Sequence, residues 1–210
     1  MYGPIAPPAA ATLLLLVVAA TPLSGFWFLQ VSALQPRLGE MAQRAIWIAL
    51  RPRADHLVQV HALDMGQQIE FSLDALVRGG VRWAEYIKGV AGELQGDGFR
   101  LQGWEGVMTG NVPRGAGLSS SAALEVATAR AFALVSGIEW DGLRMARLAQ
   151  RAENNWVGVR SGIMDQAVSA AAKAGHAFFL DCRSLEYEHI PVPAELSIVI
   201  MDTSTRRGLV

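Results

Sequence analysis

The sequence predicts a fold of the α+β class, because short strand patterns come first, helical patterns follow, and strand patterns then return. Three early runs, at 44–50, 57–63 and 68–73, alternate or are rich in β-branched residues and are separated by polar breaks. Helical patterns follow residue 119, and strand patterns resume at residue 176. With 210 residues, the chain is long enough to bury a core in one large domain or two small ones.

Each predicted element rests on its own pattern. We expect the three early strands to be antiparallel neighbours. The segment 81–94 repeats apolar residues at helical spacing, starting with Trp83, and 99–108 alternates like a strand that leads into a glycine-rich loop. The further predicted helices cover 120–136, 140–153 and about 161–173, and the further predicted strands cover 176–181, 185–190 and 196–202.

Charge and cysteine content exclude several classes of protein. Charged residues make up 18% of the chain and the net charge is −1, which does not suggest a polyanion-binding surface, so we expect no nucleic-acid partner. Cys182 is the only cysteine, so an intramolecular disulfide and a cysteine-built zinc site are excluded. We expect an ordinary buried thiol and a reducing, cytoplasmic setting. The four histidines are too scattered to predict a metal site: His56, His61, His176 and His189.

The first 40 residues differ from the rest of the chain. Residues 1–36 contain no charged side chain, and 11–34 is long enough to cross a bilayer. No Lys or Arg precedes the apolar run, as a signal peptide would require. Pro22 and Gly25 interrupt it, although membrane helices tolerate such residues. Two interpretations stay open for 1–40: a membrane-associated segment, or a non-native start such as a frameshift or an incomplete gene model.

The stretch "GNVPRGAGLSSSAALEVATA" (110–129) places glycines and serines directly before a predicted helix. Gly115 and Gly117 allow a positive φ and a close approach of a ligand to the backbone. A helix N-terminus attracts anions, and serine hydroxyls there add hydrogen-bond donors and an oxygen ligand for Mg²⁺. The stretch lacks the Lys of a Walker loop and the third Gly of a dinucleotide fingerprint. Alone, it predicts either a nucleoside triphosphate site or a serine-capped helix after a glycine turn.

This stretch resembles the central phosphate loop of the GHMP kinases, and three others resemble the galactokinase pattern within that family. They are "RWAEYIKGV" (82–90), "GIMDQ" (162–166) and "DCRSLE" (181–186), and they occur in the family's order. The resemblance covers about residues 41–210. It implies a GHMP kinase N-terminal domain, with a ribosomal protein S5 domain 2-like α+β fold, over 41–195. Residues 196–210 would begin a truncated C-terminal domain.

The resemblance also implies a reaction and its residues. The γ-phosphoryl group of ATP would pass to galactose, with Mg²⁺ present, to give galactose 1-phosphate. Asp165 would be the catalytic base or a carboxylate that orients the sugar, Gly162 would lie against the sugar, and Ser121 and Glu153 would bind Mg²⁺. The nucleotide-binding residues implied by the family are Trp83, Gly115, Gly117, Leu118, Ser119, Ser120 and Ser121.

Plainer interpretations of these residues stay open. By its local sequence alone, Glu153 is a solvated carboxylate on a helix. Asp165 would complement a helix dipole, and Trp83 would be an aromatic residue of the core. The family's opening signature, which resembles "GRVNLIGEHTDY" and carries an arginine that stabilises the transferring phosphoryl group, has no counterpart here. We therefore expect this chain, as a monomer, to transfer phosphoryl groups poorly by itself. The alternatives are a kinase for another sugar, a non-catalytic sensor of ATP and sugar, and a membrane-tethered protein.

Overall fold

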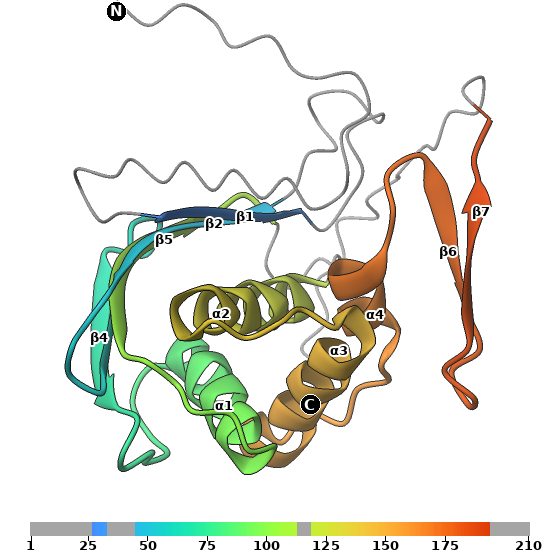
Figure 1. Cartoon of the computed structure of the whole chain (residues 1–210). Coiled ribbons are helices and arrows are strands. Elements are labelled where there is room, and N and C mark those ends of the chain that lie inside the picture. Colours follow the sequence, from blue (N-terminus) through green and yellow to red (C-terminus); the bar gives the residue numbers. More distant parts are fainter. Residues whose placement is uncertain (1–26, 33–44, 113–118, 194–210) are drawn as a thin grey trace, which may run out of the picture.

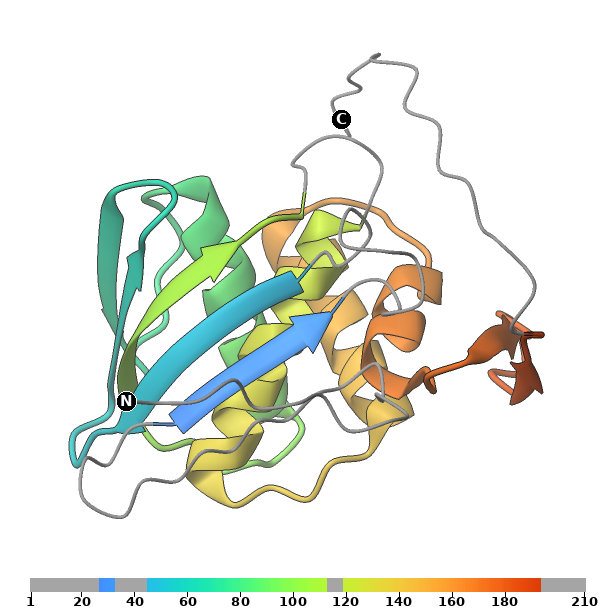
Figure 2. The same ribbon diagram turned by 90° about the horizontal axis from the view of Figure 1, so that it is seen from above.

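The computed structural model of the chain describes residues 27–32, 45–112 and 119–193, with side chains described from residue 45 onward. A five-stranded sheet is covered on one face by a layer of helices, and a two-stranded hairpin extends from one side of this core (Figure 1). Viewed from above, β1, β2 and β5 lie side by side across the helix layer (Figure 2). The α+β class predicted from the sequence is confirmed.

The sheet differs from the prediction in the order of its strands. Its order is β1-β2-β5-β3-β4, so β5 lies between β2 and β3, antiparallel to the former and parallel to the latter. The expectation that the three early strands are all antiparallel neighbours is therefore wrong for β2 and β3. The strands are β1 (Trp27–Ser32), β2 (Ala45–Pro52), β3 (Leu57–Ala62), β4 (Gln67–Ser72) and β5 (Trp104–Gly110).

Two features explain how β5 reaches this position. The chain passes through α1 (Arg82–Gly96) before it returns to the sheet, and a parallel neighbour requires a crossover of that length. Glycine also lets β5 approach its neighbours closely. A Cβ at Gly106 would lie 2.4 Å from the carbonyl oxygen of Ala49 on β2, so a larger residue there would separate the strands.

The helix layer packs around α2 (Ser120–Ser136), whose bounds match the predicted helix. Most of α2 is buried, and its many alanines allow close contact with the sheet and with the other helices. On the sheet side, Trp104 meets Phe132 edge to face, with ring centroids 5.9 Å apart. The other helices are α3 (Gly142–Arg151), the π-helix η2 (Ala152–Val157) and α4 (Met164–Ala171). The predicted helix over 140–153 thus ends partly in π-helical backbone, which its spacing does not indicate.

Strand β1 lies inside the apolar segment that precedes the predicted domain start at residue 41. It pairs antiparallel with β2, from Trp27 opposite Leu50 to Ser32 opposite Ala45. Residues 27–32 therefore extend the sheet and are not helical; the rest of the candidate membrane segment lies outside the described residues. Within the described part of the chain, no helix has the length and apolar character that crossing a bilayer requires.

The hairpin consists of β6 (His176–Leu180) and β7 (Tyr187–Pro191), as predicted, whereas the predicted strand 196–202 lies outside the described residues. Cys182 lies in the connection between the two strands and is exposed, so the expectation of a buried thiol is wrong. The connection is shaped instead by Asp181, whose carboxylate accepts hydrogen bonds from the backbone N–H groups of Arg183 and Ser184.

Candidate functional site: a serine turn above a buried Glu–Gln–Glu cluster

The chain enters α2 through a residue in the left-handed region. Ser119 has a φ of 55° and its side chain makes no capping hydrogen bond, so the interpretation as a serine-capped helix is not supported. Such strained backbone at a non-glycine residue costs about 1–3 kcal/mol and is concentrated at functional sites. Ser120 and Ser121 form the first turn and are partly exposed.

The first turn of α2 is suited to an anion. It contains no acidic side chain, and its first N–H groups have no acceptor within the helix. These N–H groups and the helix dipole therefore favour a negatively charged ligand. The remaining residues of the predicted phosphate loop, Gly115, Gly117 and Leu118, lie outside the described residues.

Behind this turn, two buried glutamates share one buried glutamine. Glu125 of α2 is fully buried, and Glu153 of η2 is 2% exposed. The Nε2 atom of Gln166, on α4, donates hydrogen bonds to Oε2 of Glu125 at 3.0 Å and to Oε2 of Glu153 at 2.9 Å. We call these three residues the Glu–Gln–Glu cluster. Ser161 also donates its hydroxyl hydrogen to Oε2 of Glu153.

The two carboxyl groups of the cluster have unequal environments. Burial, together with the nearby charges of Glu153 and Asp165, raises the pKa of Glu125 to about 8, against an opposing effect of the Gln166 hydrogen bond. Glu125 is therefore largely protonated at neutral pH. Within the described part of the chain its Oε1 atom has no hydrogen-bond partner, whereas Oε2 of Glu153 accepts hydrogen bonds from Ser161 and Gln166.

Glu153 is not the solvated helix carboxylate of the plainer interpretation, because the π-helical turn carries it into the core. π-Helical turns occur frequently at functional sites. Two contacts hold this turn against α1. The indole N–H of Trp156 donates to Oε2 of Glu85 at 3.0 Å, and the same side chain packs on Gly89.

Ser121 and Glu153 fit Mg²⁺ in their chemistry, since a hydroxyl and a carboxylate are the oxygen ligands that it prefers. Ser121 precedes Glu125 by four residues, so the two share one face of α2, and Glu125 is joined to Glu153 through Gln166. The described residues contain no group of three or more His, Cys, Asp or Glu that could hold a metal ion. This small protein donor set suits Mg²⁺, which commonly takes its other ligands from phosphates and water.

The predicted sugar-binding residues lie beside the cluster. Asp165 precedes Gln166 in the first turn of α4 and is partly exposed, and its charge contributes to the raised pKa of Glu125. Gly162 is exposed, and a Cβ placed there would meet nothing within 4 Å. The structure thus brings Asp165 and Glu153 together around Gln166. The roles of Asp165 and Gly162 toward a sugar stay predictions.

Trp83 lies in the first turn of α1, partly buried against the hydrophobic core. Its indole N–H donates to the side-chain oxygen of Gln67 at 2.7 Å. This packing agrees with the interpretation as a core aromatic, and a role beside an adenine ring stays a prediction.

Sequence reasoning missed Glu125, Gln166 and Ser161 as members of the site. One signal was present for Glu125: it is the only acidic residue in an alanine-rich predicted helix, four residues after a predicted metal ligand. Gln166 lies in the stretch "GIMDQ" that carries the resemblance, but no role was assigned to it. Ser161 gave no signal, because its importance arises from a contact with another part of the chain.

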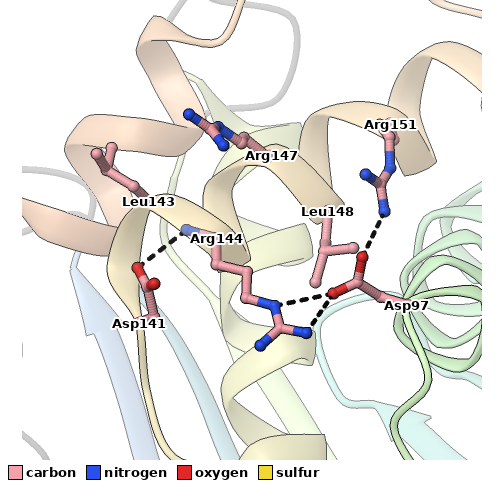
Figure 3. A pocket seen from close by; sticks show the side chains of 7 residues that line it. All are labelled: Asp97, Asp141, Leu143, Arg144, Arg147, Leu148 and Arg151. Atoms are coloured by element: carbon pink, nitrogen blue, oxygen red, sulfur yellow. Dashed lines mark hydrogen bonds and ion pairs between the residues drawn. The ribbon is translucent and has the colours of Figure 1, made fainter. Parts of the chain in front are cut away.

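A separate surface hollow of about 530 Å³ contains none of these residues (Figure 3). Its arginines are largely compensated. Arg144 donates to Asp97 at 2.8 Å, and Arg151 lies 3.3 Å from the same carboxylate (Figure 3). The hollow is lined by Asp97, Asp141, Leu143, Arg144, Arg147, Leu148 and Arg151.

Comparisons with known proteins identify relatives of this chain. The family model described as "GHMP kinases N terminal domain" matches residues 85–173. The galactokinases of Roseiflexus sp. (strain RS-1) and Chloroflexus aurantiacus are each 43% identical to this chain, over 166 and 167 residues. Those matches cover 79% of this chain but 42% and 43% of the relatives, so the chain spans less than half the length of these curated relatives.

Among solved structures, Lactococcus lactis galactokinase complexed with galactose matches with a TM-score of 0.67 and 29% identity. That match covers 88% of this chain and 46% of the other. Methanococcus jannaschii mevalonate kinase matches with a TM-score of 0.52 and 15% identity, over 71% of this chain and 52% of the other, which supports the fold alone.

Proposed function

The chain belongs to the GHMP kinase family, and from this premise we propose that it serves galactokinase chemistry, the transfer of the γ-phosphoryl group of ATP to the anomeric hydroxyl of galactose. The 43% identity to curated galactokinases supports galactose as the acceptor. The observation that carries the proposal is the buried, doubly hydrogen-bonded Glu153, with Asp165 beside the glutamine that holds it. The cytoplasmic setting expected from the lone cysteine stays a prediction.

The serine turn binds the phosphates of ATP in this proposal. The open N–H groups at the start of α2 donate to phosphate oxygens, and Ser119 and Ser120 add hydroxyl donors. Ser121 and Glu153 would hold Mg²⁺, which supplies neutralisation of the negative charge on the transferring phosphate. Glu153 is suited to this task because its two hydrogen-bond donors fix the carboxylate in one orientation.

Asp165 acts on the sugar in this proposal. It is partly exposed at the start of α4, where an ionised carboxylate can accept the proton of an acceptor hydroxyl within hydrogen-bond reach. The open space around Gly162 lets a sugar approach the backbone there. The acceptor oxygen then attacks the γ-phosphorus, the bond to the bridging oxygen of ADP breaks, and the proton remains on Asp165 or is shared with it.

The nucleotide assignment is tested by replacing Gly117 with Val in the full chain. We expect the variant to lose Mg·ATP binding, because a branched side chain blocks the close approach of phosphate to the loop backbone. Isothermal titration calorimetry measures the affinity, and Gly96→Ala, at a position with open space around it, is the matched control. Undiminished affinity in Gly117→Val would refute the phosphate-loop assignment.

The acceptor assignment is tested in a galactokinase that carries residues 45–193 of this chain in place of its own matching segment. We expect this chimera to phosphorylate galactose, and Asp165→Asn to lower kcat by about 10²–10⁴-fold, the range typical of general-base assistance. Asp64→Asn, at an exposed turn, should leave kcat unchanged. Full turnover in Asp165→Asn would disprove the role of Asp165. Binding of ATP and galactose without turnover in the chimera would favour a non-catalytic sensor.

A further inference from the structure

We propose that Gln166 is a positioning residue of this kinase site: its amide group joins Glu153 to Glu125 and thereby fixes the carboxylate that the proposed function assigns to magnesium. The inference rests on that proposed function and goes beyond it, because it assigns a role to a residue that touches neither substrate. Gln166 is 1% exposed, so it acts from within the core.

The geometry of the amide supports this role. A side-chain amide has two N–H donors, and both bonds of Gln166 Nε2 go to carboxyl oxygens, at 3.0 and 2.9 Å. In the opposite orientation its carbonyl oxygen would face Glu153, which as a carboxylate has no donor, so contact with Glu153 fixes which way the amide faces. One planar group thus sets the separation of two carboxyl groups that come from different helices.

Stability alone does not account for this arrangement. The Oε1 atoms of Gln166 and of Glu125 are both buried and have no hydrogen-bond partner among the described residues. Each buried polar atom without a partner costs about 1–3 kcal/mol, so an apolar contact between these helices would be more stable. A network that lowers stability but holds a proposed metal ligand in one place is typical of the residues that surround metal sites.

The position of Gln166 also links the two sides of the site. Asp165, the preceding residue, is partly exposed, whereas Gln166 reaches α2 and η2 through the core. The start of α4 therefore holds the proposed sugar carboxylate and the support of the proposed metal carboxylate in a fixed relation. Ser161 gives Glu153 a second donor, and its own backbone N–H donates to Asn154 at 2.9 Å.

The test compares nucleotide affinity with and without Mg²⁺ in the full chain. Calorimetry with a non-hydrolysable ATP analogue gives Kd in Mg²⁺ and in EDTA. In Gln166→Met, which keeps the length of the side chain but removes its donors, we expect the gain in affinity due to Mg²⁺ to fall at least 10-fold. The affinity in EDTA should stay within 2-fold of wild type. Gln95→Met is the matched control, because it removes a 2.9 Å bond to the carbonyl of Leu73, outside the cluster.

A second measurement uses the wild-type protein and does not depend on the folding of a variant. The side-chain NH₂ signals of Gln166, assigned by comparison with Gln166→Asn, should exchange slowly with solvent and shift on addition of Mg²⁺ with the ATP analogue. The inference would be overturned if Mg²⁺ raised the affinity for the ATP analogue as much in Gln166→Met as in wild type. It would also be overturned if the Gln166 NH₂ signals exchanged rapidly with solvent and did not shift. Equal affinities of wild type in Mg²⁺ and in EDTA would instead refute the metal assignment of the proposed function. Slow exchange of the Gln166 NH₂ group with solvent would then still show that Gln166 holds Glu153, and rapid exchange would show that it does not.

Discussion

Glu125→Gln should change the pH dependence of stability, because wild-type Glu125 holds a proton that the unfolded chain releases. The pKa of this carboxyl rises from 4.5 in its ordinary environment to about 8 in the folded protein. Between these values the folded state binds about one more proton than the unfolded state. Raising the pH through this window therefore favours unfolding, by about 1.4 kcal/mol per pH unit and on the order of 5 kcal/mol in total.

The glutamine variant removes this titration and keeps the shape of the side chain. Its oxygen still accepts the hydrogen bond from Gln166, so we expect a small change in stability near pH 5. As the pH rises toward 8, wild type should lose stability relative to Glu125→Gln with the slope given above, and the difference should level off at higher pH. Urea unfolding followed by tryptophan fluorescence, at intervals of one pH unit and in EDTA, measures this difference.

The comparison has a clear refutation. Parallel stability profiles of wild type and Glu125→Gln between pH 5 and 8 would show that Glu125 does not take up a proton on folding. A difference of opposite sign, with wild type gaining stability as the pH rises, would mean that the folded protein stabilises the ionised form of Glu125.

Two other substitutions test different parts of the fold. Gly89→Ala should destabilise the chain by about 1–2 kcal/mol in urea unfolding, because its Cβ would lie 2.9 Å from that of Trp156. Gly96→Ala, with open space in the same helix, should stabilise the chain by about 0.5 kcal/mol. Equal effects of the two substitutions would disprove the contact between Gly89 and Trp156. Arg51 and Arg53 lower the pKa of Glu105, so its contribution to stability is present above about pH 4.5 and is lost as the pH falls through the lowered value. Glu105→Gln should therefore be less stable than wild type at pH 6 and equal to it in strong acid, and a constant difference would contradict the ion pairs.

Local patterns predicted the individual elements well. The helix 120–136 matches α2 because its start follows a serine and its end precedes Gly137, which has a φ of 65°. The position of β5 between β2 and β3 could not be predicted from hydrophobic periodicity, because periodicity identifies a strand but not its neighbours in the sheet. Strand β1 escaped recognition because an uncharged apolar run gives the same signal for a buried strand as for part of a membrane segment.

The candidate site was predictable in part. Glu153 and Ser121 were identified by resemblance, while the spacing around Glu153 alone favoured a solvated carboxylate. Its burial depends on a π-helical turn and on Trp156 packing against α1, and neither follows from the local sequence. The contacts of Gln166 were missed for the same reason, since they reach residues 41 and 13 positions away in the chain.

The pairing of β1 with β2 also has a consequence for self-association. Six residues of β1 satisfy one side of β2, so β2 is an interior strand of the sheet. A shortened chain that lacks residues 27–32 would present that row of backbone N–H and C=O groups to solvent, on a strand that contains Ile46, Trp47 and Ile48. An unprotected apolar edge of this kind templates pairing with other chains and leads to aggregation. Strand β1 thus removes β2 from the edge of the sheet, so that the backbone groups of β2 are paired and cannot template contacts with another chain.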